Sequence, residues 1–325
     1  MLVRNFIGMI YRFIPFSIRY GDFYNKYLTR IKFFVKLEQQ KIKTETDKLL
    51  IKQINYAIYH IPFYQKFTHI VSIDELSKLP IVNKIIISEN FKAFLNPQLS
   101  HKGLKSNTGG SSGTPFSFFI EKGVTRPKEA AHFNWYWKKY GYIHRAKVLM
   151  IRGKSLRNNA DFEYQAIGNK LVVSCYNLHQ ESIKEIHTQI AKFNPKFIHA
   201  YPSSLLVFTK ELQLFLNNNP LKFKIETIFL GSENLFDQDK IYFETFYNSK
   251  IVNWYGHSEC LIHGGKCELS GDYHFYSFYG YLELVDEKDS IIEEPGIEGR
   301  IVATGFDNSV MPLIRYDTGD WKSVV

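Results

Sequence analysis

Short runs of β-branched and aromatic residues alternate with segments of helical periodicity after about residue 145, and this alternation limits the fold more than any other feature. Strands are predicted at 147–152, 197–200, 227–230 and 250–254, and helices at 182–192, 202–217 and 237–246. Strands that alternate with helices are typical of α/β units built on a parallel sheet. From Tyr273 onward, the runs HFYSFYGYLELV and GRIVATG predict antiparallel strands.

The first 100 residues follow a different pattern. From Phe23 to about His60, polar and apolar residues alternate at helical spacing, and strand signals are scarce. We therefore expect a helical region at 1–100 and an α/β core at 101–325 that ends in antiparallel strands. The predicted fold class is α/β, with mixed or parallel sheets flanked by helices and a partial antiparallel β subdomain.

The composition excludes several classes of protein. Of the 325 residues, 45% are hydrophobic and 16% aromatic, which indicates a globular chain. The net charge of +9 suits an anionic ligand, but the basic residues are spread along the chain, without an Arg-rich run or a zinc-finger spacing. We expect no nucleic-acid partner. The 3 cysteines are too few for a disulfide framework and fit a reducing cytoplasm.

The first 15 residues form a candidate amphipathic helix. Its apolar stripe is interrupted by basic residues, and the segment lacks a small-residue cleavage site, so it does not resemble a signal peptide. The stripe consists of Leu2, Phe6, Met9, Ile10 and Phe13, with Arg4 and Arg12 nearby. Two interpretations stay open: a helix that docks on its own core, or a peripheral contact with anionic lipid that would add membrane association to a cytoplasmic location.

The segment SNTGGSSGTP at 106–115 holds three glycines and five hydroxyl side chains in ten residues. Glycines let backbone N–H groups turn inward, and hydroxyl groups add donors that an anionic oxygen can accept. This is the chemistry of a loop that binds a polyphosphate, although a solvated linker has a similar composition. The loop lacks the GK[ST] ending of a Walker motif, which argues against a P-loop NTPase.

Two predicted strands end in a glycine, a hydroxyl and a carboxylate. The strand TIFL is followed by Gly231-Ser232-Glu233, and the strand IVNW by YGHSE at 255–259. Open parallel sheets bind ligands at the carboxyl ends of their strands. Trp254 and Tyr255 could stack on a flat base, and Glu259 could hold a Mg²⁺ ion that bridges phosphates. The alternative for either segment is a surface turn with a helix cap.

Two further segments carry candidate ligands. Asp320 in PLIRYDTGD could accept two hydrogen bonds from a ribose diol, although Asp and Gly are also common turn residues. Four soft ligands fall within fifteen residues, which approaches the spacing of a structural zinc site. These are Cys260, His263, Cys267 and His274.

In this order the segments resemble the adenylate-forming superfamily, specifically its phenylacetate-CoA ligase-like branch with the CapK-like proteins of capsule biosynthesis. TGGSSGTP resembles that family's phosphate loop, GSE its middle motif, YGHSE its adenine and magnesium motif, and RYDTGD its ribose motif. The N-terminal stretch LLIKQINYAIYHIPFY is also similar to the family. The resemblance spans essentially the whole chain, and it implies the fold of the family's large N-terminal domain.

The resemblance also implies a reaction and a set of site residues. Such enzymes join a small carboxylic acid to ATP, with Mg²⁺, to give an acyl-adenylate, and then pass the acyl group to a thiol, amine or hydroxyl. Ser258 would touch phosphate, Glu259 would bind Mg²⁺ and Asp320 would hold the ribose. The phosphate loop would be Thr108, Gly109, Gly110, Ser111, Ser112, Gly113 and Thr114, and the nucleotide contacts Gly231, Ser232, Glu233, Tyr255 and Gly256.

Other positions depart from the family or allow two interpretations. Tyr201-Pro202-Ser203-Ser204 occupies the place of the family's acyl pocket, but helix capping explains Pro202 and Ser203 equally well. Related enzymes carry a further lid domain with a catalytic lysine, whereas five residues follow Asp320 here. We therefore expect the lid to be absent, through truncation, as a fragment, or because another chain supplies it, and adenylation to be slow without it.

Two functions remain at this stage. The first is an ATP-dependent enzyme that activates a carboxylic acid and supplies an acyl or aminoacyl group for a surface polysaccharide. The second is a catalytically incompetent remnant or a nucleotide-binding partner protein.

Overall fold

The computed structural model describes residues 8, 10–11, 13–108, 116–176 and 178–323. The chain divides into two compact units, and each unit combines two separate segments. Unit 1 contains residues 1–19 and 133–255, and unit 2 contains residues 20–132 and 256–325. The sequence analysis instead placed a single boundary near residue 100.

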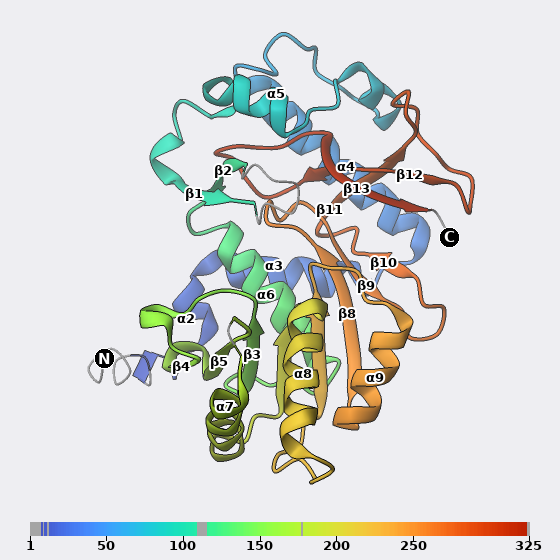
Figure 1. Cartoon of the computed structure of the whole chain (residues 1–325). Coiled ribbons are helices and arrows are strands. Elements are labelled where there is room, and N and C mark those ends of the chain that lie inside the picture. The colour runs from blue at the N-terminus through green and yellow to red at the C-terminus, as the bar shows by residue number, and fades with distance from the viewer. Residues whose placement is uncertain (1–7, 9, 12, 109–115, 177, 324–325) are drawn as a thin grey trace. The chain divides into compact units, whose positions relative to one another are not determined.

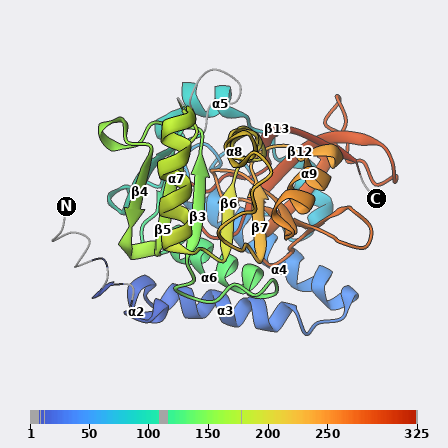
Figure 2. The same ribbon diagram turned by 60° about the horizontal axis from the view of Figure 1, so that its bottom comes forward.

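Unit 1 is built on six strands in the order β8-β7-β6-β3-β5-β4. β3, β5, β6, β7 and β8 are parallel, and β4 pairs antiparallel with β5 at the edge. Figure 2 shows β5, β3, β6 and β7 side by side. The strands are β3 (Val148–Arg152), β4 (Phe162–Gln165), β5 (Lys170–Ser174), β6 (Phe197–Ala200), β7 (Thr227–Gly231) and β8 (Lys250–Gly256).

Three helices pack on this sheet, with α8 between α7 and α9 (Figure 1). They are α7 (Gln180–Phe193), α8 (Pro202–Leu216) and α9 (Asp237–Tyr247). Ile183, Ile186 and Ile190 recur at helical spacing on α7 and are buried in a core shared with β3, β6 and β7. Each helix is followed by an asparagine in the left-handed conformation, with φ of 49°, 43° and 47°, which ends the helix without a glycine.

The predicted alternation of strands and helices in unit 1 is confirmed, with shifts of one or two residues at the ends. The alternation could be predicted because the strands are buried: every residue of β7 and most residues of β6 are buried, so these strands consist of short apolar runs. The sequence analysis missed β4 and β5. Two single-turn helices, η4 (Arg157–Asn159) and η5 (Ala166–Gly168), flank β4, and a short helix α2 (Phe16–Tyr20) lies near the chain start.

Unit 2 combines N-terminal helices with antiparallel strands from both of its segments. Its hairpins pair β1 with β2 and β9 with β10, and its three-stranded sheet has the order β11-β12-β13. The strands are β1 (Gly103–Asn107), β2 (Ser117–Glu121), β9 (His263–Lys266), β10 (Tyr273–Phe275), β11 (Gly280–Val285), β12 (Glu298–Gly305) and β13 (Tyr316–Ser323). The predicted antiparallel strands are therefore confirmed, but β10 and β11 do not pair with each other.

The helices of unit 2 lie mostly in its first segment. They are α3 (Asp22–Phe34), α4 (Gln39–His60), α5 (Lys84–Glu89) and the single-turn helices η1 (Ile73–Lys78), η2 (Phe91–Phe94) and η3 (Ser100–Lys102). The helix α6 (Thr125–Lys138) begins in unit 2. The single helical stretch predicted at 23–60 is two helices, which are separated at residues 35–38.

Candidate functional site

The Gly/Ser loop joins the two strands of a hairpin. Strand β1 ends at Asn107 and β2 begins at Ser117, where the Ser117 hydroxyl donates to the Asn107 side chain at 2.7 Å. The Thr108 N–H donates to the Phe116 carbonyl at 2.9 Å, and the Phe116 N–H donates to the Thr108 hydroxyl at 3.0 Å. Gly109, Gly110, Ser111, Ser112, Gly113 and Thr114 lie outside the described residues. The two ends of the loop are thus held together, which a linker between domains does not require.

In unit 1, the loops after neighbouring strands meet at the carboxyl ends of the sheet. The Ser203 N–H, after β6, donates to the Glu233 carboxylate, after β7, at 2.9 Å. The Arg152 guanidinium at the end of β3 lies 4.7 Å from the centre of the Tyr201 ring. The predicted acyl-pocket residues and the GSE motif therefore occupy one edge of this sheet.

Gly231 is required by the close approach of a ring. A Cβ atom at this position would lie 2.4 Å from the Trp254 indole, well inside van der Waals contact. The next residue, Ser232, has a positive φ of 71°, and its side chain and that of Glu233 are exposed. Tyr255 follows Trp254 in β8 and is half-buried. A larger residue at 231 would displace the aromatic surface that the sequence analysis assigned to base stacking.

Unit 2 holds the carboxylate that the resemblance assigns to magnesium. The Glu259 side chain is 6% exposed. One of its oxygens lies 3.0 Å from His257 Nδ1, and the other accepts a hydrogen bond from the Tyr316 hydroxyl at 2.9 Å. Burial alone would raise the pKa of Glu259, but the His257 and Tyr316 hydrogen bonds outweigh it and hold the pKa below its usual value. Glu259 is therefore anionic at neutral pH.

Tyr316 connects three of the predicted motifs. It belongs to RYDTGD, it donates to Glu259 of YGHSE, and its ring stacks on Phe116 with centroids 6.1 Å apart. Phe116 follows the Gly/Ser loop directly. Burial, with Glu259 nearby, raises the pKa of the Tyr316 hydroxyl, so it remains a donor. The sequence analysis did not single out Tyr316 or His257, because their roles depend on contacts between distant segments.

The segment after Glu259 is held by the first turns of α6. Lys128 is 1% exposed, and its Nζ donates to the carbonyls of Tyr279 at 2.9 Å and Cys260 at 3.3 Å. The same ammonium group lies 3.6 Å from Asp307. The neighbouring Glu129 accepts hydrogen bonds from the Tyr279 hydroxyl and the Cys260 thiol. Cys260 has a positive φ of 58°, and these contacts fix that conformation.

Asp320 lies in a bulge of β13 and is exposed. Asp317 pairs with Val302 and Trp321 pairs with Arg300. Between these two pairs β13 advances by four residues and β12 by two, so β13 bulges. Gly319 has a φ of 79°, and its N–H donates to the Asp317 side chain at 2.9 Å. The predicted turn is thus present inside a strand. Ser258 is likewise exposed.

Arg315 of the same motif has a structural role. Its guanidinium donates to Glu283 at 2.9 and 3.2 Å and to the Leu79 carbonyl at 2.7 Å. Both charged side chains are almost fully buried. The ion pair lies within the second segment of unit 2, and the hydrogen bond to Leu79 joins it to the first segment.

The structure does not bring the four predicted zinc ligands together. Within the described ranges, no three His, Cys, Asp or Glu side chains gather closely enough to bind a metal ion. His263 packs against the His132 ring at 4.2 Å, and Cys260 contacts Glu129. Cys267 forms hydrogen bonds with Ser270 and His274 at the β9–β10 hairpin. The prediction failed because spacing along the chain does not fix the direction of side chains.

The predicted N-terminal stripe falls mainly on residues that the structure does not describe. Of its members, Ile10 and Phe13 are described, and both are more than half exposed. Among the described residues, no helix has the length and apolar character needed to cross a membrane.

Comparisons with known proteins agree with this fold. No family model matches the chain. Protein CapK of Staphylococcus aureus is 24% identical over 259 residues, which cover 77% of this chain and 54% of that protein. The chain thus spans about half the length of this curated relative.

Two solved structures of 2-hydroxyisobutyryl-CoA ligase are also similar. The open conformation, in complex with 2-HIB-AMP and CoA, has a TM-score of 0.65 at 19% identity and covers 85% of this chain and 68% of that one. The thioesterification state has a TM-score of 0.65 at 19% identity, with 86% and 64% covered. The chain is a homologue of Protein CapK and has the fold of the adenylate-forming acyl-CoA ligases.

Proposed function

We propose that this protein activates a small carboxylic acid with ATP, giving an acyl-adenylate and pyrophosphate, and transfers the acyl group to a thiol, amine or hydroxyl. One observation carries the proposal. Tyr316 of RYDTGD donates to Glu259 of YGHSE and stacks on Phe116, which follows the loop TGGSSGTP. Segments predicted to hold ribose, magnesium and phosphate are therefore joined within one compact unit.

Glu259 suits a magnesium ion. Mg²⁺ in nucleotide sites is usually held by one or two carboxylates together with substrate phosphates, so a cluster of three protein ligands is not required. Glu259 is buried and anionic, and each of its oxygens keeps a second lone pair beside the contact to His257 or Tyr316. When bound, the ion would neutralise charge that develops on the phosphates.

The remaining residues bind and orient the substrates. The backbone N–H groups and hydroxyls of 108–114 would hold the β and γ phosphates, Ser258 would contact phosphate, and Asp320 would accept from the ribose. Gly231, Ser232, Glu233, Tyr255 and Gly256 would border the nucleotide, with Gly231 leaving room for the Trp254 ring. Oriented donors of this kind are worth about 3 kcal/mol each in other enzymes.

The relation to CapK extends the proposal to a cellular role. We propose that the activated acyl or aminoacyl group is destined for a surface polysaccharide, and that the protein works in the cytoplasm. Peripheral contact with lipid through residues 1–15 is part of this proposal, and nucleic acid is not a proposed partner. The alternative function is nucleotide binding without turnover. It is favoured by Thr114-Pro115-Phe116, where related phosphate loops often carry a lysine beside the proline.

Pyrophosphate exchange separates the two functions. The purified chain is incubated with Mg-ATP, labelled pyrophosphate and a panel of aryl, fatty, amino and 2-hydroxy acids. Exchange that depends on one of the acids is expected. Silence with every acid, despite measurable ATP binding, would exclude the activation reaction for this chain and leave nucleotide binding alone.

A pair of variants tests the role of Glu259. Glu259→Gln should weaken Mg-ATP binding by more than about tenfold, because one interaction with a charged group contributes about 1.5–3 kcal/mol. Cys260→Ser, at the next position, should leave binding unchanged because the thiol contacts Glu129 instead. Isothermal titration at fixed Mg²⁺ measures both. Equal losses would show that the segment is merely sensitive to substitution and would remove Glu259 from the metal site.

A further inference from the structure

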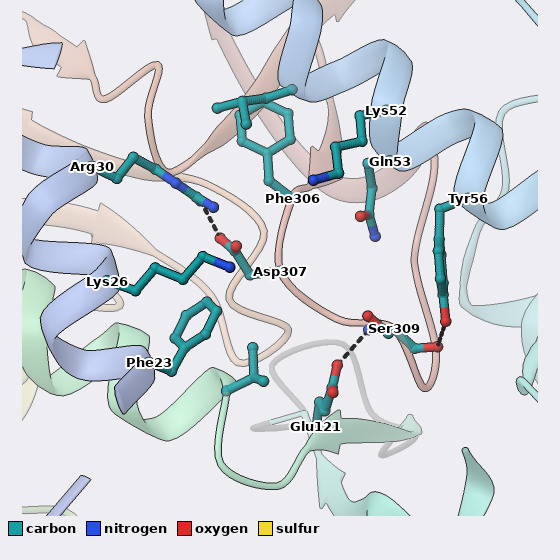
Figure 3. Close-up of a pocket in the computed structure, with 12 residues that line it drawn as sticks. Phe23, Lys26, Arg30, Lys52, Gln53, Tyr56, Glu121, Phe306, Asp307 and Ser309 are labelled. Atoms are coloured by element: carbon teal, nitrogen blue, oxygen red, sulfur yellow. Dashed lines mark hydrogen bonds and ion pairs between the residues drawn. The ribbon is translucent and has the colours of Figure 1, made fainter. Parts of the chain in front are cut away.

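Unit 2 contains a cavity of about 200 Å³ that the proposed reaction does not use. It lies between α3, α4 and the chain that connects β12 to β13 (Figure 3). Phe23 and Phe306 contribute aromatic walls. Cavities that combine apolar walls with a few charged groups are the usual form of small-molecule sites.

Three cations line this cavity. Lys26 and Arg30 come from α3 and Lys52 from α4, and Figure 3 shows their nitrogen atoms directed toward the space beside Asp307 and Phe306. Lys26 and Lys52 have no carboxylate within ion-pair distance in the part of the chain that the structure describes. Arg30 is paired with Asp307 at 2.7 Å. Two ammonium groups are therefore available to an incoming anion.

The two carboxylates of the cavity are already engaged. Asp307 accepts from Arg30 and also lies 3.6 Å from the buried Lys128. Glu121 accepts the Ser309 N–H at 2.6 Å, at the far side of the cavity from Arg30 in Figure 3. Because Asp307 is shared between two cations, the side of the cavity that faces Lys26 and Lys52 carries excess positive charge.

A polar group in the wall adds a second recognition element. Gln53 is 7% exposed, and its amide nitrogen donates to the Asn308 carbonyl at 3.2 Å. This contact leaves its oxygen as an acceptor at the cavity, where it can receive a hydroxyl group. Lysine ammonium groups act as point charges and Arg30 offers a planar fork, a combination that matches the oxygens of a phosphate group.

The geometry points to a binding site for a small phosphate monoester in this cavity, separate from the nucleotide site proposed above. Its phosphate would lie between Lys26, Arg30 and Lys52, and its small organic part would contact Phe23 and Phe306. The same cations could accept free inorganic phosphate, so the two ligands must be compared directly.

The test is isothermal titration of the full chain with glycerol 3-phosphate, inorganic phosphate and glycerol, at constant ionic strength. Binding of glycerol 3-phosphate and not of glycerol is expected. The double variant Lys26→Met/Lys52→Met should weaken this binding at least about tenfold, given the strength of charged hydrogen bonds. Lys32→Met, an exposed position of α3 outside the cavity, is the matched control.

The outcomes separate this site from the nucleotide site. Glu259→Gln should leave glycerol 3-phosphate binding unchanged, even though it is expected to weaken Mg-ATP binding. Equal affinity for inorganic phosphate would show that the organic part is not recognised and would overturn the monoester assignment. Binding that survives in the double variant, or that Lys32→Met weakens as much, would overturn the site. The lysine variants avoid Arg30, whose loss would leave Asp307 with one cation and could disturb folding.

Discussion

Substitution of Lys128 by Met removes a buried charge that holds the turn after Glu259. The ammonium group makes one well-placed hydrogen bond to the Tyr279 carbonyl at 2.9 Å and a longer one to Cys260 at 3.3 Å. A hydrogen bond to a charged group contributes about 1.5–3 kcal/mol net of desolvation, so the well-placed bond to Tyr279 is worth about 2 kcal/mol and the longer one to Cys260 adds little. The expected net loss is about 2 kcal/mol, because Asp307 keeps Arg30 as a partner.

Hydrogen exchange measured by mass spectrometry is the appropriate assay, since the two units need not unfold together. The Cys260 N–H donates to the His257 carbonyl at 3.0 Å and the Tyr279 N–H to the Tyr276 carbonyl at 2.8 Å, so both amides report on the clamped segments. A local loss of about 2 kcal/mol corresponds to exchange roughly thirtyfold faster at these positions. Arg126→Met, at an exposed position of the same helix, should stay within about 0.5 kcal/mol of the wild type.

Two results would refute this reasoning. Unchanged exchange at Cys260 and Tyr279 in Lys128→Met would show that the two carbonyls are adequately hydrated without the ammonium group. Faster exchange throughout unit 2, and equally in Arg126→Met, would show that α6 as a whole had been weakened and that the clamp is not specific.

Two further predictions concern buried ionisable groups. Arg315→Met should lower the free energy of unfolding by about 3–5 kcal/mol, because it leaves Glu283 buried without its partner. Urea unfolding followed by circular dichroism measures this loss, and adding Glu283→Leu should recover much of it. A double variant as unstable as the single one would contradict this. Burial, with Arg152 nearby, holds the pKa of His199 well below its usual 6.5, so below about pH 6.5 the unfolded chain binds a proton that the native chain does not. Stability should therefore fall by up to about 1.4 kcal/mol for each pH unit between pH 6.5 and 5, and His199→Phe should remove that part of the slope; identical slopes in both proteins would count against it.

The parts of the fold that could be predicted from the sequence are those in which local pattern and burial agree. β7 and α8 were found because TIFLG is buried throughout and α8 begins with a proline at its first position. The break at 35–38 was missed because the residues there, VKLE, include neither glycine nor proline. At the break, the Lys36 N–H donates to the Phe33 carbonyl and the Leu37 N–H to the Phe34 carbonyl, so the last turn of α3 tightens and ends. The hairpin that holds the Gly/Ser loop was also missed, since β1 is short and mostly polar.

The candidate site shows the same limit. The motif YGHSE identified Glu259, but its hydrogen bond to Tyr316 joins residues 57 positions apart. Likewise, nothing local to Arg315 reveals that it pairs with Glu283 and so serves the core. The zinc prediction failed for a related reason, because His263 turns into a cluster of rings with His132. Spacing can nominate ligands, whereas tertiary packing decides which of them meet.

The interrupted course of unit 2 along the chain has a consequence for synthesis on the ribosome. Residues 20–132 emerge before residues 256–325, yet several of their polar groups find partners only in that second segment. The Asn96 N–H donates to the Val310 carbonyl at 2.9 Å and the Val82 N–H to the Arg315 carbonyl at 3.0 Å. The strands and helices of 133–255, by contrast, are contiguous and can fold as they appear. The N-terminal helices must therefore wait, with their apolar faces exposed, until translation has passed residue 315.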